Sequence, residues 1–248
     1  MSKKNKSIII TGAGTGIGRH CARKFLKAGY QVELIGRTES ALIETAKNSE
    51  NALVLTCDIQ NQLEVRRSFQ NALKKWGHLD LLFNNAGVVT PSARVDKISI
   101  DDWREVIDIN LTGSFICAQE AFTIMKNQKP QGGRIINNGS ISSHVPRPGS
   151  APYTAAKHGV TGLTKSLSLD GRRFNIVCGQ IDIGNALTEM TRTMQEGVMQ
   201  ANGTTAIEPT MTPEHVATTL IQMAEFPLDV NIQFVTIMAS EMPYIGRG

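Results

Sequence analysis

The residues of this chain best suited to chemistry are Ser140, Tyr153 and Lys157, because a hydroxyl, a phenol and an ammonium together can move a proton to or from a carbonyl oxygen. Residues 149–152 read Gly-Ser-Ala-Pro, a typical helix start, which places Tyr153 and Lys157 on the first turns of one helix. Side chains four residues apart share a helix face. Ser140 ends a predicted strand and is positioned to hydrogen-bond a substrate oxygen as charge develops on it.

The proposed proton exchange requires a shifted phenol. For Tyr153 to work near neutrality its pKa must fall by about 3 units, which takes roughly 4 kcal/mol. The ammonium of Lys157 at about 4–5 Å supplies about that much at an effective dielectric constant of about 20. An isolated Tyr–Lys pair is more often ordinary helix surface, but the cluster with Ser140 favours an acid–base role for Tyr153.

A glycine-rich turn occupies residues 11–18, which read Thr-Gly-Ala-Gly-Thr-Gly-Ile-Gly. A β-branched run at 7–10 precedes it, and an apolar pattern at helical spacing follows Gly16 and stops at Gly29. In a strand–turn–helix unit, such glycines let the backbone approach a pyrophosphate, whose charge the helix N-terminus binds. No Gly-Lys-Ser/Thr follows, which argues against a nucleotide-hydrolysing P-loop.

Arg37 follows the second predicted strand, residues 31–35. A site for NAD generally has a carboxylate here for the ribose hydroxyls, whereas the 2′-phosphate of NADP needs a cation. Glu33 lies inside the strand and is no substitute for that carboxylate. The sequence therefore favours NADP over NAD.

Strand-like and helix-like stretches alternate along the whole chain without a linker or a repeat. The predicted strands are 7–10, 31–35, 53–56, 81–83, 134–137, 175–177 and 232–236, and the predicted helices follow Gly16 and cover 62–75, 101–125, 150–169 and 213–224. This alternation predicts an α/β fold of Rossmann type: a doubly wound, mainly parallel sheet in a single domain, 1–248, with residues 1–6 as a flexible tail. Ligands of such sheets bind beyond the carboxyl ends of the strands. That is where Gly12, Arg37, Asp58, Asn85 and Ser140 fall.

Composition fits a cytoplasmic enzyme with a small-molecule substrate. The 26 basic and 22 acidic residues give a net charge of only +4, and the one basic cluster, near the N-terminus, lacks interleaved aromatic residues, so we expect no nucleic-acid partner. The four cysteines form no C-x-x-C pair, and we expect no metal site. The sequence shows neither a membrane span nor a secretory signal, so we expect no membrane partner.

Taken together, these motifs resemble the short-chain dehydrogenase/reductase family, in its single-domain branch of about this length. The resemblance rests on the turn at 11–18, Asp58 after the third strand, Asn-Asn-Ala-Gly at 84–87, Asn110 in the long helix, and Ser140 with Tyr153-x-x-x-Lys157. It implies a catalytic tetrad of Asn110, Ser140, Tyr153 and Lys157, in which Lys157 also holds the nicotinamide ribose and Asn110 supports a proton relay. The implied cofactor contacts are Gly12, Thr15, Gly16, Ile17, Gly18, Arg37, Thr38, Asp58, Ile59, Asn85, Ala86, Gly87, Tyr153, Lys157 and Ile181.

Three segments depart from the family pattern. Residues 178–185 lack the usual Pro-Gly and the threonine that helps to hold the cofactor; the alignment there is open by one residue, and Ile181 is carried over as a backbone contact to the nicotinamide. The connection at 169–174 is shorter than is typical, and the ending at 242–248 differs.

The variable segment of the family maps to about 185–211. Its methionine-rich apolar pattern fits an adaptable substrate lid or an ordinary amphipathic helix. His144 and Arg147 either line the pocket or lie exposed in a loop.

Three classes of function remain. An NADP-dependent alcohol dehydrogenase or carbonyl reductase is favoured because every member of the tetrad is present. A noncatalytic dinucleotide-binding sensor or scaffold would fit if Ser140, Tyr153 or Lys157 were missing, and none is. A nucleotide-sugar epimerase or dehydratase shares the Tyr-x-x-x-Lys pair but generally carries a further substrate domain. The resemblance and the long amphipathic helices also predict a homotetramer or homodimer.

Overall fold

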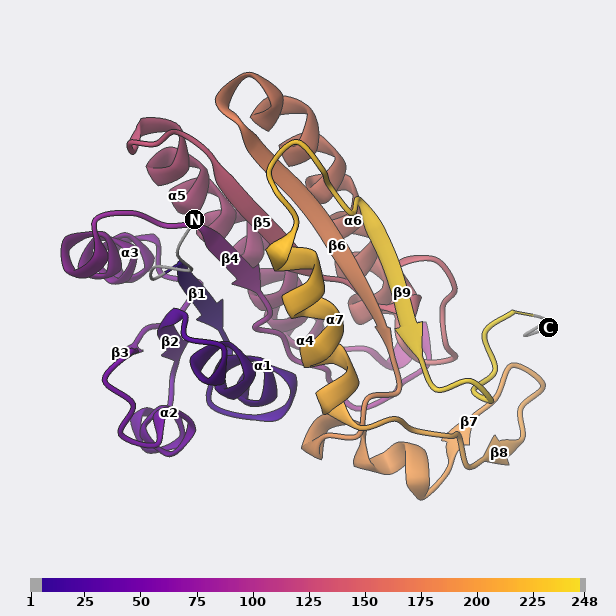
Figure 1. Ribbon diagram of the computed structural model, residues 1–248. Helices are drawn as coiled ribbons and strands as arrows, with labels where there is room; N and C mark the ends of the chain where they lie inside the picture. Colours follow the sequence, from indigo (N-terminus) through magenta and orange to yellow (C-terminus); the bar gives the residue numbers. More distant parts are fainter. Residues whose placement is uncertain (1–5, 246–248) are drawn as a thin grey trace.

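The computed structural model describes residues 6–245, so of the predicted tail at 1–6 only Lys6 lies among the described residues. Within this range one parallel sheet of seven strands has the order β3-β2-β1-β4-β5-β6-β9 and carries helices on both faces (Figure 1). The strands are β1 (Ser7–Thr11), β2 (Gln31–Gly36), β3 (Ala52–Thr56), β4 (Leu81–Asn84), β5 (Gly133–Asn138), β6 (Ile176–Gly184) and β9 (Phe234–Met238). The helices are α1 (Gly16–Lys27), α2 (Glu39–Ala46), α3 (Gln62–Trp76), α4 (Ile100–Ile107), α5 (Ser114–Asn127), α6 (Ala151–Gly171) and α7 (Pro213–Glu225). The predicted doubly wound parallel sheet is confirmed.

The central strand β1 shows why the sheet is buried on both faces. Its apolar run alternates sides: Ile8 and Ile10 pack in the core with α1, α2 and α7, and Ile9 packs in the core with α3 and α5. All three side chains are fully buried. Because β1 lies between β2 and β4, the strand order reverses at this point. A crevice for a ligand is expected there, beyond the carboxyl ends of β1 and β4.

The predicted long helix at 101–125 contains a π-helical turn in its middle. A π-helical turn, Asp108–Gly113, separates α4 from α5. Asn110 lies in this turn; the Ser114 hydroxyl donates to its carbonyl at 2.8 Å, and its own side chain is bound to the backbone of Val88. π-turns of this kind occur frequently at functional sites. The predicted helix is confirmed over 101–125, with a π-turn inside it that the apolar pattern did not indicate.

The last part of the sheet also differs from its sequence prediction. Strand β6 continues to Gly184, well beyond the predicted 175–177. Gln180 and Asp182 interrupt its apolar pattern, but both are fully buried and hydrogen-bonded. Helix α2 was not predicted. In the segment 185–211 the chain forms a 3₁₀ turn (Glu189–Gln195) and a short antiparallel pair, β7 (Val198–Met199) and β8 (Thr205–Ala206), rather than an α-helix.

Candidate active site

The glycine-rich turn leaves β1 and enters α1 at the carboxyl edge of the sheet. Gly12 and Gly16 have φ angles of +64° and +48°, which glycine adopts without strain. A Cβ on Gly18 would collide with the carbonyl of Gly12, so the turn closes only around glycine. Thr15 is the N-cap of α1 and makes no side-chain capping bond. The first N–H groups of a helix have no partner within it, so this edge suits a phosphate group.

The Asn-Asn-Ala-Gly segment is bound directly to that turn. The Thr11 hydroxyl accepts from the main-chain N–H groups of Asn85 and Ala86, each at 2.9 Å. The Asn85 side chain donates to the Thr11 carbonyl at 2.9 Å and accepts from the side chain of Asn138 at the same distance. The ends of β1, β4 and β5 are therefore held together by side-chain amides. These bonds hold the carboxyl ends of the three strands together where the ligand crevice is expected.

The candidate residues for the adenosine end of a cofactor lie beyond β2 and β3. Arg37 and Thr38 are exposed, and Thr38 is the N-cap residue of α2. The main-chain N–H of Asp58 donates to Glu64 at 2.9 Å, and its carboxylate accepts from the N–H of Gln60 at 3.0 Å. Ile59 beside it is buried. The structure thus leaves the Arg37 guanidinium accessible to an anion at this edge.

Ser140, Tyr153 and Lys157 meet at the carboxyl end of β5. Tyr153 and Lys157 lie on the first turns of α6, as predicted, and the ammonium is 5.5 Å from the centre of the tyrosine ring. The Ser140 side chain is close enough to the phenol to lower its pKa. Lys157 donates to the carbonyl of Asn138 at 2.7 Å and is buried. The three groups therefore form one cluster although Ser140 comes from a different element.

Asn110 is bound to the segment that follows β4, and the π-turn that carries it packs against α6. Its side-chain oxygen accepts from the N–H of Val88 at 2.7 Å, and its side-chain nitrogen donates to the carbonyl of Val88 at 2.8 Å. A Cβ on Gly87 would come within 3.2 Å of the same oxygen. The side chain of Asn110 is thus occupied in holding the backbone. Its main-chain carbonyl accepts a hydrogen bond from the Ser114 hydroxyl and has a second lone pair for the predicted proton relay.

The electrostatics of the cluster differ from the sequence expectation in one respect. Burial lowers the pKa of Lys157 to about 8, and the nearby Asp182 carboxylate opposes this fall. Burial raises the pKa of Tyr153 above its usual value, while the Ser140 side chain and the positive charge of Arg147 lower it in part. We expected Lys157 to acidify the phenol. Its ammonium bonds to the Asn138 carbonyl and lies 5.5 Å from the centre of the tyrosine ring, and the groups that lower the pKa of the phenol are Ser140 and Arg147.

Asp182 is a buried carboxylate of this site that the sequence interpretation missed. One carboxylate oxygen accepts from the main-chain N–H of Ser140 at 3.0 Å and from the Gln180 side chain at 2.7 Å. The other pairs with Nε2 of His144 at 2.9 Å. The available signal was an acidic residue inside the segment that departs from the family pattern.

Arg147 connects the loop after Ser140 to the segment 185–211. Its guanidinium donates to Glu208 at 2.6 Å and to the side-chain oxygen of Asn185 at 2.8 Å. The Arg147 side chain is 14% exposed and that of Glu208 is 1% exposed, so this ion pair is buried. Of the two alternatives for the loop residues, Arg147 is therefore packed inside, whereas the His144 side chain is 41% exposed.

The segment after β6 brings a threonine, Thr188, next to the glycine-rich turn. The Thr188 methyl group lies 3.4 Å from the position of a Cβ on Gly16, so Thr188 contacts the glycine-rich turn. Ile181, in contrast, lies inside β6, where its carbonyl accepts from the N–H of Gly139 at 2.8 Å and its side chain is fully buried. Its predicted contact with the nicotinamide stays a prediction.

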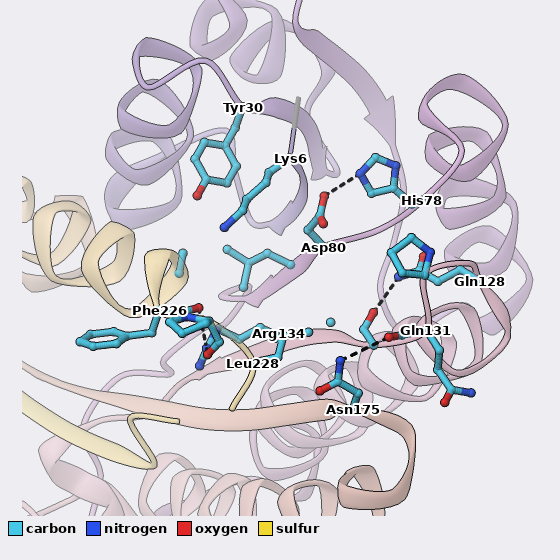
Figure 2. Close-up of a pocket in the computed structure, with 16 residues that line it drawn as sticks. Lys6, Tyr30, His78, Asp80, Gln128, Gln131, Arg134, Asn175, Phe226 and Leu228 are labelled. Carbon is cyan, nitrogen blue, oxygen red and sulfur yellow. Dashed lines mark hydrogen bonds and ion pairs between the residues drawn. The ribbon is translucent and has the colours of Figure 1, made fainter. Parts of the chain in front are cut away.

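A separate cavity of about 220 Å³ lies at the amino ends of the strands, opposite the crevice. Figure 2 shows its polar lining, in which Asp80 pairs with His78 and the guanidinium of Arg134 points toward the loop carrying Phe226 and Leu228. Within residues 6–245 there is no group of three His, Cys, Asp or Glu side chains that could hold a metal ion. No helix in that same range is long and apolar enough to span a bilayer.

The sheet order and the cluster at its carboxyl edge define the protein as a Rossmann-type α/β protein. A sequence profile described as short chain dehydrogenase matches residues 6–198, and the chain belongs to this family. Over 193 residues it is 36% identical to a 3beta-hydroxysteroid dehydrogenase of Mediterraneibacter gnavus, the match covering 75% of this chain and 68% of that protein. It is 34% identical over 205 residues to an acetoacetyl-CoA reductase of an Acinetobacter species, covering 80% and 81% of the two chains.

Solved structures agree with this fold. A variant of actinorhodin polyketide ketoreductase crystallised with NADPH superimposes with a TM-score of 0.83 at 26% identity, over 95% of this chain and 97% of that one. A 3-ketoacyl-(acyl-carrier-protein) reductase of Brucella melitensis with NADH gives a TM-score of 0.86 at 23% identity, over 96% and 99% of the chains. The protein is thus an oxidoreductase of a family acting on CH–OH and C=O groups.

Proposed function

We propose that this protein is an NADP(H)-dependent carbonyl reductase or alcohol dehydrogenase in which Tyr153 is the acid and base. The observation that supports this most directly is the cluster of Ser140, Tyr153 and Lys157 at the carboxyl end of β5, beside the glycine-rich turn. A noncatalytic sensor would have no need for a serine, a phenol and a buried lysine gathered at one place.

Each residue of the cluster has a definable task. A bound nicotinamide supplies the hydride. In the reducing direction the Tyr153 hydroxyl donates its proton to the substrate oxygen, while the Ser140 hydroxyl hydrogen-bonds the negative charge that develops there. Lys157 as an ammonium stabilises the tyrosinate left behind and supplies hydrogen bonds to the nicotinamide ribose. The main-chain carbonyl of Asn110 supports the relay that returns a proton from water to Tyr153.

The residues at the carboxyl edge fit a dinucleotide. Gly12, Gly16 and Gly18 have no side chain to keep a ligand away from the backbone of the turn. A pyrophosphate there would accept hydrogen bonds from the N–H groups at the start of α1. Thr188, lying against Gly16, is placed to help hold the same phosphates. Arg37, exposed beyond β2, would pair with a 2′-phosphate. The remaining contacts assigned from the resemblance lie at the start of α1 or just beyond the ends of β2, β3 and β4. They are Thr15, Ile17, Thr38, Asp58, Ile59, Asn85, Ala86 and Gly87.

The role of Tyr153 is tested by replacing Tyr153 with Phe. Single-turnover hydride transfer should fall by about 100-fold or more, because general acid–base catalysis contributes about 10²–10⁴-fold, while NADPH affinity stays close to that of the parent. Tyr30→Phe, which changes a tyrosine packed edge-on against Phe25, is the matched control and should transfer hydride normally. Near-parental transfer by Tyr153→Phe across the pH range would reject the acid–base role.

The choice of cofactor is tested by titrating NADPH and NADH separately. A charge-assisted contact of about 1.5–3 kcal/mol predicts roughly ten- to hundredfold tighter binding of NADPH. Arg37→Asp should erase or reverse that preference. Arg67→Asp makes the same change of charge at an exposed position on α3 and should leave the preference unchanged. Equal affinity of the parent for both cofactors would reject the assignment of Arg37.

The substrate of this reaction is a small carbonyl or alcohol compound. The names of the relatives include a hydroxysteroid dehydrogenase and reductases of 3-oxoacyl thioesters, so a panel of these classes and of simple ketones, followed by NADPH absorbance, is the first screen. We assign residues 185–211 as the substrate lid, because the buried Arg147–Glu208 pair joins them to the loop before Tyr153. A cytoplasmic location fits reduction by NADPH.

A further inference from the structure

The fully buried Asp182 on β6 lies next to a glycine that follows the neighbouring strand β5. β5 and β6 pair in parallel up to Asn138 and Ile181, so Asp182 lies beside Gly139, the next residue of that chain segment. A Cβ on Gly139 would overlap the Asp182 carboxylate. Glycine at this position therefore leaves room for a charged group directly behind Ser140. A buried carboxylate is unfavourable unless it is paired and hydrogen-bonded, so its surroundings show what it does.

Both oxygens of the carboxylate are hydrogen-bonded. Oδ1 accepts the main-chain N–H of Ser140 at 3.0 Å and the side chain of Gln180 at 2.7 Å. Oδ2 pairs with Nε2 of His144, whose side chain is 41% exposed. The bond to Ser140 holds the main chain of the residue whose side chain lowers the pKa of Tyr153. Asp182 thus sets the backbone position of a hydroxyl in the cluster without touching the reacting atoms itself.

The charge of Asp182 acts on a second member of the cluster. Lys157 is buried, and its hydrogen bond at 2.7 Å goes to a neutral carbonyl, that of Asn138. The Asp182 carboxylate raises the pKa of Lys157 against the larger lowering by burial. The groups around this pair are Tyr153 on α6, Gln180 on β6, and Ser140, His144 and Arg147 on the loop after β5. None of these side chains is a carboxylate, so Asp182 supplies the negative charge that opposes the loss of the lysine proton.

We propose that Asp182 is a positioning residue for the hydride transfer proposed above: it orients Ser140 through the main chain and is the counter-ion that keeps Lys157 cationic. His144 covers its solvent side. The role rests on the proposed function, because Lys157 is there assigned to the nicotinamide ribose and to Tyr153. Its measurable consequence is the pH at which Lys157 stops supporting cofactor binding.

Asp182→Asn separates the charge from the geometry. The amide oxygen can still accept from Ser140 and Gln180, and the amide nitrogen can donate to Nε2 of His144 in its other tautomer, so the hydrogen bonds survive. NADPH affinity, followed by fluorescence titration, should match that of the parent at about pH 6. The decline of affinity at alkaline pH should begin about one pH unit lower than in the parent, because the ammonium has lost a neighbouring opposite charge.

A matched pair at His144 tests the same coupling where substitution is tolerated. His144→Lys places a permanent cation beside Oδ2 and should move the alkaline decline to lower pH, as in Asp182→Asn. His144→Gln retains a neutral donor and should leave the profile of the parent unchanged. Because His144 is half-exposed, both variants are expected to fold even if Asp182→Asn does not.

Either of two results would overturn the role of Asp182. In the first, Asp182→Asn and His144→Lys both follow the parent's pH profile. In the second, Asp182→Asn shifts the profile equally in a Lys157→Met background, where no ammonium remains to be tuned. Failure of the parent to bind NADPH or NADH at any pH would instead refute the proposed function, and this role with it. An acid-ward shift in both charge variants that is absent in the Lys157→Met background supports the role.

Discussion

Glu33 offers the sharpest test of how burial changes this protein's response to pH. Its side chain is fully buried on β2, and the Ser68 hydroxyl donates to Oε1 at 2.5 Å. The other oxygen, Oε2, has no hydrogen-bond partner within residues 6–245. Burial raises the pKa of this carboxyl from 4.5 to about 8, and the Ser68 hydrogen bond opposes part of that rise. Folded Glu33 is therefore protonated at neutral pH.

The sign of the effect on stability follows from proton linkage. Between pH 4.5 and about 8 the folded carboxyl holds a proton that the unfolded carboxyl has lost. The free energy of unfolding must then fall as pH rises, by about 1.4 kcal/mol per pH unit, or about 5 kcal/mol over the whole window. The stabilising contribution is complete below the unfolded pKa and is lost as pH rises through the folded pKa.

Glu33→Gln removes the titration while keeping the shape of the side chain and its acceptor for Ser68. The variant should match the parent within about 1 kcal/mol at about pH 5 and exceed it by about 3–5 kcal/mol at about pH 8. Urea unfolding followed by circular dichroism, at one protein concentration, gives both values. Glu50→Gln, at an exposed position, is the control for loss of a surface charge. A stability difference between Glu33→Gln and the parent that stays constant from about pH 5 to pH 8 would refute the reasoning.

Three further predictions concern the cofactor turn, the catalytic helix and assembly. Gly18→Ala should weaken NADPH binding by at least about tenfold, measured by fluorescence titration, because the added methyl meets the Gly12 carbonyl; unchanged affinity would contradict the tight turn. Gly162→Ala on α6, where a Cβ meets nothing within 4 Å, should raise the free energy of unfolding by about 0.5–1 kcal/mol in urea titrations, and a loss of stability would mean that the exposed face is covered. Light scattering should give a dimer or tetramer of the 27.0 kDa chain, because Phe115 on α5 and Leu169 on α6 are 47% and 61% exposed; a monomer at micromolar concentration would count against it.

Much of the sheet could be predicted from local pattern. The apolar run of β1 is buried on both faces, and the turn after it contains glycine where φ is positive. The four-residue spacing of Tyr153 and Lys157 placed both on α6. Each of these features depends on residues that are close in sequence, where strand or helix periodicity and backbone freedom act directly. The extension of β6 beyond residue 177 was not predicted, because Gln180 and Asp182 are polar residues typical of loops and their buried hydrogen-bond partners are distant in sequence.

The sequence by itself determined the class of the fold, the phosphate-binding turn and the identity of the groups that could transfer a proton. Only the tertiary structure decided how those groups are tuned. Asp182 meets the Ser140 N–H across 42 positions of chain, and Arg147 meets Glu208 across 61. Such pairs form because the folded chain excludes water around them, and the same exclusion raises the pKa of Tyr153 and lowers that of Lys157. Burial is a property of packed surfaces, so no local spacing of residues reports it.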